Sequence, residues 1–152
     1  MELEIVIDKL TQKLPDNFKD LKFIKIVEGT KNTLIEEFQN IDTLNCEELK
    51  CENLKLKKLP NLPNVKKLQC KKNKLKKLPD LPECLELECS NNNLTLLPNL
   101  DKCRELDCEN NRIKKLPNLP ECIDLDCSDN MLEELPTYCH LCLVLWYSLI
   151  HH

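Results

Sequence analysis

The sequence predicts one solenoid, with short parallel β-strands on one face and extended or turn-like backbone on the other. Three observations predict it: a 19-residue period, alternating apolar residues early in each period, and Leu-Pro pairs in its second half. The chain has 152 residues, which is the length of one domain with a continuous core.

Five units of this period cover residues 46–140 without a gap, and the unit at 103–121 reads CRELDCENNRIKKLPNLPE. Numbered within each unit, position 4 is always Leu and position 6 is always Cys. Position 9 is Asn in four of the five units, and positions 14 and 15 are Leu-Pro in all five. A fixed period this strict is typical of a solenoid, whose units bury their apolar faces by stacking on one another. The units begin at Cys46, Val65, Cys84, Cys103 and Cys122.

Positions 1 to 7 alternate in character, which predicts a short strand with positions 4 and 6 pointing inward and positions 3, 5 and 7 outward. Most units carry two Pro, which removes backbone donors and favours a polyproline-like return on the far side. Nineteen residues leave too little chain for a strand, two turns and a full helix. We therefore expect little helix.

The pattern Leu-x-Cys-x-x-Asn-x-Leu-x-x-Leu-Pro-x-Leu-Pro resembles a leucine-rich repeat of the shortest class. It is similar to repeats of bacterial type III secretion effectors and of giant DNA viruses, and the composition is closer to the viral group. The resemblance implies a concave strand face used for binding and an inward Asn that satisfies backbone groups. Three features depart from it: Leu54 replaces the first repeated Asn, Tyr138-Cys139 replaces the last Leu-Pro, and no ubiquitin-ligase domain is present.

Residues 1–45 are predicted to be degenerate N-terminal repeats that cap the stack. Ile5 and Ile7 precede Ile24 and Ile26 by one period, which predicts two further strands. The segment NTLIEEFQNI at 32–41 has apolar residues at helical spacing, so we expect a short helix in the longer unit before Cys46. The apolar residues of that segment are Leu34, Ile35, Phe38 and Ile41.

Residues 141–152 are predicted to form a C-terminal apolar cap, with a docking or membrane-contact segment as the alternative. The apolar run LCLVLWYSLI has ten residues, which is short of the ~20 that a membrane-spanning helix needs. The N-terminus lacks the basic region of a secretory signal. With eleven Cys, an odd number, the sequence indicates reduced thiols and a cytoplasmic location, which would be the host cytoplasm for a viral protein.

Nine of the eleven cysteines fall at positions 1 or 6, where we expect them to fill the core. Adjacent parallel strands hold equivalent Cβ atoms ~4.8 Å apart, beyond the ~3.8 Å of a disulfide. A ladder of thiols also forms a line, whereas tetrahedral metal ligands converge on a point. The segment YCHLC at 138–142 is the one cluster that resembles a ligand set, so metal binding there stays an alternative.

The outward strand positions carry nine carboxylates among fifteen residues. We expect this acidic concave face to bind a basic protein surface or peptide, which makes the chain a non-catalytic protein–protein interaction module. The alternative is a solvated face that discourages self-association. The nine candidate residues are Glu48, Glu52, Glu86, Glu88, Glu105, Asp107, Glu109, Asp124 and Asp126.

A second alternative is nucleic-acid binding through a basic ridge at positions 10, 12 and 13, although no nucleic-acid-binding motif accompanies it. The ridge consists of Lys55, Lys57, Lys58, Lys74, Lys76, Lys77, Arg112, Lys114 and Lys115, with only Glu133 and Glu134 opposing them. We expect no enzyme, cofactor, small-molecule substrate or membrane partner. The chain has one Gly, so it has no Gly-rich phosphate loop, and all three His lie after residue 139.

Overall fold

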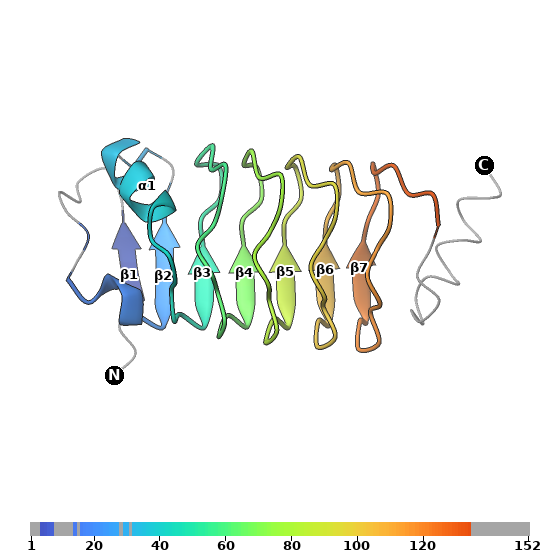
Figure 1. The fold of residues 1–152 in the computed structure, drawn as a ribbon, viewed down its shortest axis with the longest axis horizontal. Helices are drawn as coiled ribbons and strands as arrows, with labels where there is room; N and C mark the ends of the chain where they lie inside the picture. Colours follow the sequence, from blue (N-terminus) through green and yellow to red (C-terminus); the bar gives the residue numbers. More distant parts are fainter. Residues whose placement is uncertain (1–3, 8–13, 15, 28, 31, 135–152) are drawn as a thin grey trace.

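The computed structural model describes residues 4–7, 14, 16–27, 29–30 and 32–134. Seven strands form one parallel sheet in chain order, as Figure 1 shows. This arrangement confirms the predicted solenoid of short parallel strands with little helix. The strands are β1 (Glu4–Ile7), β2 (Phe23–Ile26), β3 (Glu48–Lys50), β4 (Lys67–Gln69), β5 (Glu86–Glu88), β6 (Glu105–Asp107) and β7 (Asp124–Asp126).

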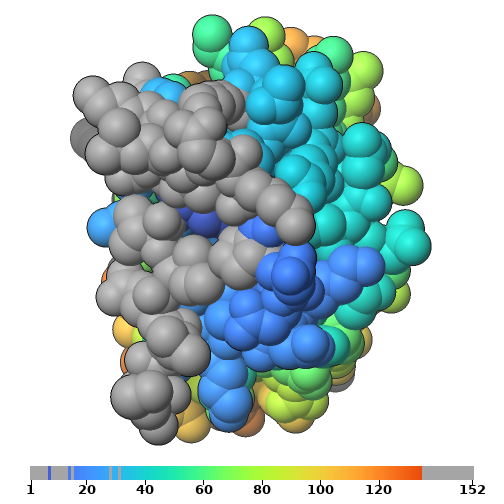
Figure 2. Space-filling model, turned by 90° about the vertical axis from the view of Figure 1, so that its left-hand side faces the viewer, coloured from blue at the N-terminus to red at the C-terminus, as the bar shows by residue number. Residues whose placement is uncertain are grey.

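The register between strands follows the sequence period. From β3 to β7 each strand occupies positions 3 to 5 of its unit, and the Leu at position 4 lies beside the Leu of the next strand. In β1 and β2, Ile5 pairs with Ile24 and Ile7 pairs with Ile26. The two degenerate strands expected from the isoleucine spacing are therefore confirmed. Viewed from the N-terminal end in Figure 2, the later turns line up behind the first ones as one stack.

The longer unit between β2 and β3 contains the predicted helix, α1 (Asn32–Gln39). Its Leu34, Ile35 and Phe38 are buried, and Ile41 packs against the core just beyond the helix end. The ring of Phe38 meets that of Phe18, in the 3-10 helix η1 (Phe18–Asp20), edge-on with centroids 6.4 Å apart. The extra residues of this unit therefore cover apolar surface at the N-terminal end of the core.

Cysteine fills the core beneath the strands, as the sequence predicts. All nine cysteines of the described turns are reduced and buried. Burial in apolar surroundings raises the pKa of the Cys46, Cys84 and Cys103 thiols to about 12, and it raises those of Cys51 and Cys89 well above their ordinary value. These thiols therefore act as small apolar side chains. The remaining cysteines, at 139 and 142, lie outside the described residues.

The repeated asparagine forms the inward ladder that the resemblance implies. Asn111 Oδ1 accepts the backbone N–H of Leu94 at 3.0 Å, and its Nδ2 donates to the carbonyl oxygens of Cys89 and Cys108, each at 3.1 Å. Asn73, Asn92 and Asn130 repeat this arrangement in their own turns. Because buried backbone groups must find partners, the ladder stabilises the bends that follow β3 to β7.

The residue before this asparagine column adopts a left-handed backbone conformation in every unit. The φ angles lie between 50° and 57° at position 8, which is occupied by Asn53, Lys72, Asn91, Asn110 and Asp129. Asn and Asp tolerate this conformation better than other side chains. Lys72 is therefore the one member of the column whose residue type suits its backbone poorly.

Candidate functional site

The candidate site is the outward face of the sheet, defined as the side chains at strand positions 3, 5 and 7. The alternating burial of the strands places position 4 inside and positions 3 and 5 at the surface. All nine predicted carboxylates lie on this face: Glu48, Glu105, Asp124 and Asp126 are exposed, and Glu52, Glu86, Glu88, Asp107 and Glu109 are half-buried. Each of them therefore lies on the side of the sheet that the sequence predicts.

The two carboxylates of β5 are neutralised by Lys67 of β4 and by Lys71 in the turn after it. Lys67 Nζ lies 2.5 Å from Glu86 Oε2, and Lys71 Nζ lies 2.6 Å from Glu88 Oε2. The hydrogen bonds to Glu86 and Glu88 raise the pKa of Lys67 and of Lys71, respectively. Burial raises the pKa of Glu88, but the hydrogen bonds from Lys71 and Gln69 outweigh it and leave that pKa below its ordinary value.

Glu48 and Glu52, on the N-terminal side of β4, also have lysines beside them. Glu48 pairs in register with Lys67 across the sheet. The carboxylate of Glu52 lies between two ammonium groups, 3.6 Å from Lys50 Nζ and 3.8 Å from Lys71 Nζ. Four of the nine predicted residues, two on either side of β4, therefore have a cation close by.

The five carboxylates of β6, β7 and their following turns differ: none of them forms an ion pair with any residue that the structure describes, and the strand residues among them lie in register beside carboxylates only. Glu48 also forms no ion pair with a described residue, but it has Lys67 beside it in register. We call this group the β6–β7 patch. It consists of Glu105, Asp107, Glu109, Asp124 and Asp126. In register, Glu105 lies beside Asp124 and Asp107 lies beside Asp126. Like charges therefore face one another twice across this strand pair.

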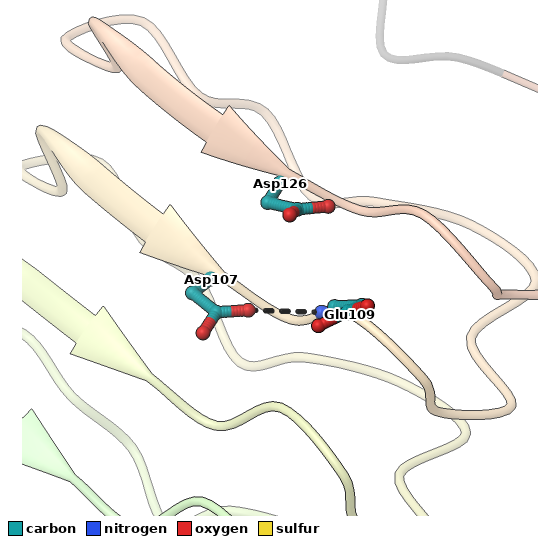
Figure 3. A group of neighbouring side chains, drawn as sticks. All are labelled: Asp107, Glu109 and Asp126. Carbon is teal, nitrogen blue, oxygen red and sulfur yellow. Dashed lines mark hydrogen bonds between the residues drawn. The ribbon is translucent and has the colours of Figure 1, made fainter.

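Hydrogen bonds to the chain hold two aspartates of the patch in place. Asp107 accepts the Ser90 hydroxyl at 2.8 Å and the Glu109 backbone N–H at 3.2 Å, the latter drawn in Figure 3. Asp126 accepts both the hydroxyl and the backbone N–H of Ser128. Glu105 and Asp124 have no side-chain hydrogen bond to a described residue, so their carboxylates remain open to a partner.

Three of these side chains converge enough to suggest a cation. Carboxylate oxygens of Asp107, Glu109 and Asp126 lie within 4.8 Å of one another, and Figure 3 shows them at the carboxyl ends of neighbouring strands. Calcium takes about six to eight oxygen ligands, and these three carboxylates are partly exposed to solvent. The cluster by itself therefore does not define a metal site.

Two open hollows lie on the outward face, one on each side of its centre. A hollow of about 380 Å³ lies over β2, β3 and β4, where Phe23, Lys25 and Lys50 line it. The other, of about 320 Å³, lies over β5, β6 and β7 and is lined mainly by carboxylates. The face is thus contoured as well as charged.

The basic ridge expected from positions 10, 12 and 13 is divided into two parts. Six exposed lysines occupy the first two units: Lys55, Lys57, Lys58, Lys74, Lys76 and Lys77. The third unit interrupts them with Asn93, Thr95 and Leu96. Beyond this gap Lys114 pairs with Glu133 at 2.8 Å, and Lys115 pairs with Glu134 at 2.5 Å. The continuous ridge is therefore limited to the first two units.

The Cys/His cluster at 138–142 and the apolar cap at 141–152 lie outside the described residues, so both stay predictions. In the part of the chain that the structure describes, no helix combines the length and apolar character needed to cross a membrane. Comparison with models of protein families gives no match, and no curated protein is significantly similar to the chain. The arguments about function therefore rest on the chain's own residues.

Proposed function

We propose that the chain is a non-catalytic protein–protein interaction module whose β6–β7 patch binds a basic protein surface or peptide. The observation that carries the proposal is the set of five carboxylates without an ion pair among the described residues. Like charges in register on neighbouring strands each cost up to ~1 kcal/mol. A cationic partner would remove that repulsion on binding, and the field of the patch would speed its association.

Glu105 and Asp124 are the best positions to test, because they are exposed and do not support the backbone through their side chains. The experiment compares proteins that co-purify with the wild type and with the Glu105→Lys, Asp124→Lys variant. A matched control, Asp80→Lys with Glu121→Lys, makes the same charge change at exposed positions outside the outward face. We expect basic partners to be retained by wild type and control and lost by the patch variant. Identical partner sets for all three proteins would contradict the proposal.

We also propose that the chain is a leucine-rich repeat protein of the shortest class, as its pattern implies. Two observations support this assignment: the hydrogen bond from the Leu54 N–H to Asn73, which joins residues one period apart, and the column of buried leucines. The buried, reduced cysteines support a reducing compartment such as the cytoplasm. An experimental structure whose turns do not superimpose on leucine-rich repeats would contradict the assignment, and fractionation of cells would test the location.

Nucleic-acid binding remains a second candidate because six exposed lysines gather in the first two units. Such binding would weaken steeply as salt rises, since each phosphate contact releases counterions. The Lys57→Glu, Lys76→Glu variant would abolish it and leave binding to the β6–β7 patch unchanged. Salt titrations with a duplex and with a single strand, each against this variant, test the candidate.

A further inference from the structure

The middle column of the outward face changes charge from one end to the other. Position 5 and its equivalent in β2 hold six residues that are neighbours in register across the sheet. In order from β2 to β7 they are Lys25, Lys50, Gln69, Glu88, Asp107 and Asp126. Two cations, one neutral amide and three anions therefore follow one another along the stack.

The flanking columns increase this separation. The outward positions of β2, β3 and β4 and the turns after them carry four Lys and two Glu. The same positions of β5, β6 and β7 carry seven carboxylates and two Ser, with neither Lys nor Arg. By formal charge the face is therefore mildly cationic over its first half and strongly anionic over its second half, and the Lys67–Glu86 and Lys71–Glu88 ion pairs join the two halves at their boundary.

This charge distribution disfavours a second copy of the chain as the occupant. Two faces meeting head to tail would place Lys25 near Asp126 and Lys50 near Asp107. The same arrangement would place Glu48 near Glu105 and Glu52 near Glu109, and both faces carry an excess of carboxylates. Like-charge juxtaposition of this kind disfavours an interface. A partner with an overall positive charge fits better.

We propose that the outward face binds an extended, charge-segregated peptide segment, with Lys or Arg over β5–β7 and Asp or Glu over β2–β3. This proposal rests on the proposed function and adds the chemistry and orientation of the partner. The acidic end of the segment would meet Lys25 and Lys50 in the first hollow, and its basic end would meet the β6–β7 patch in the second.

The geometry also sets the length of the segment. Strands in a sheet lie ~4.8 Å apart, so the six strands from β2 to β7 span ~24 Å. An extended chain advances ~3.4 Å per residue, so about eight residues cross this distance. The acidic and basic groups of the partner should therefore lie about four to seven residues apart.

Three ten-residue probe peptides test the proposal by titration at low salt. The segregated peptide has two Glu at one end and four Lys at the other, and the shuffled peptide has the same composition with alternating charges. The cationic peptide has Gln in place of both Glu. On the wild type, we expect the segregated peptide to bind about tenfold tighter than the shuffled one.

The Lys25→Glu, Lys50→Glu variant should change the affinities for the segregated and the cationic peptide in opposite directions. It should bind the segregated peptide about tenfold more weakly, because the acidic end of that peptide loses its partners. It should bind the cationic peptide more tightly, because two cations of the face have become anions. The matched control, Lys57→Glu with Lys76→Glu on the ridge, should leave the ratio between segregated and shuffled peptides unchanged. Circular dichroism confirms that each variant is folded.

The failures of the two proposals are distinguishable. If segregated and shuffled peptides bind equally to the wild type, and both lose affinity with Glu105→Lys, Asp124→Lys, charge segregation is wrong and the interaction module stands. If the Lys25→Glu, Lys50→Glu variant strengthens the segregated peptide's binding, the proposed orientation is overturned. If none of these three peptides binds better than a fourth, uncharged peptide of ten residues, both proposals are wrong.

Discussion

Asn73 Oδ1 accepts a hydrogen bond of 3.0 Å from the backbone N–H of Leu54, which lies nineteen residues earlier in the chain. The Nδ2 atom of the same side chain donates to the Cys51 carbonyl of that earlier turn at 2.8 Å and to the Cys70 carbonyl of its own turn at 2.9 Å. One buried amide thus joins the backbones of two successive turns. The ladder is a direct bond between repeats, in addition to the strand pairing.

Replacing a member of this ladder should destabilise the protein strongly. In Asn92→Ala, the Leu75 N–H and the Cys70 and Cys89 carbonyls lose a buried partner. Each unsatisfied group costs about 1–3 kcal/mol, so we expect the free energy of unfolding to fall by roughly 3 kcal/mol. Asn93→Ala is the matched control, because the backbone N–H of Asn93 donates to the Leu75 carbonyl and this hydrogen bond remains when the side chain is removed. Equal urea-unfolding midpoints for the two variants would contradict the structural role of the ladder.

Lys72→Asn should stabilise the protein. Lys72 has φ 57°, and Asn occupies the equivalent position in three of the other four units. A left-handed conformation costs an ordinary L-residue ~1–2 kcal/mol, and Asn carries less of this cost. We expect a gain of about 0.5–1 kcal/mol in the free energy of unfolding, measured by urea titration. Lys74→Asn makes the same substitution where φ is not positive, and a gain of the same size there would refute the backbone explanation.

The core cysteines should resist alkylation in the folded protein. The pKa of Cys46, Cys84 and Cys103 rises from 9.0 to about 12, which lowers the thiolate population roughly a thousandfold. Since the thiolate is the nucleophile and these sulfurs are buried, we expect iodoacetamide to label them only after urea unfolding. Thr95→Cys provides an exposed thiol as an internal reference, followed by peptide mass spectrometry. Native labelling of Cys46 at the rate of the thiol at position 95 would show that the core opens readily.

Glu47 should make a pH-dependent contribution to stability. Its hydrogen bonds with Lys22 and Lys66, at 2.5 and 2.9 Å, lower its pKa from 4.5 to about 2. A lowered folded-state pKa means that the stabilisation is fully present above pH 4.5 and is lost as the pH falls toward 2. The difference in unfolding free energy between wild type and Glu47→Gln should therefore shrink across this interval.

Glu37→Gln on the exposed side of α1 serves as the control for that pH series. Its difference from wild type should stay small at every pH between 2 and 6, because Glu37 is exposed and forms no ion pair with a residue that the structure describes. A pH-independent effect of Glu47→Gln would indicate that the ion pairs of Glu47 do not persist in solution. Adding salt should weaken the Glu47 effect, since these side chains are partly exposed.

The sequence predicts the backbone arrangement well because burial is periodic. The isoleucine spacing identified both degenerate strands, and the apolar spacing at 32–41 identified α1. The left-handed column at position 8 was not predicted, although Asn or Asp in four of its five residues was a readable signal. Its period coincides with that of the neighbouring Asn column, so the repeat pattern alone does not separate the backbone role of position 8 from the side-chain role of position 9.

The outward face was predicted in composition but not in arrangement. Alternation along a strand fixes which side of the sheet a residue occupies, and all nine carboxylates lie on the expected side. Alternation does not determine which neighbouring residue a long side chain contacts. The ion pairs of Lys67 with Glu86 and of Lys71 with Glu88 are therefore known only from the structure. Lys25 was missed because α1 lengthens its unit and removes β2 from the 19-residue alignment.

Every strand of this sheet pairs only with the strands before and after it. In-frame loss of residues 84–102, which are one complete unit, would join the second unit directly to the fourth and leave the 19-residue pattern unbroken. Lys67 would then face Glu105 in place of Glu86, and Gln69 would face Asp107 in place of Glu88. A gene encoding this chain can therefore lengthen or shorten the outward face, and with it the proposed binding surface, by whole periods. Point substitutions adjust its charge independently, so reach and selectivity can evolve separately.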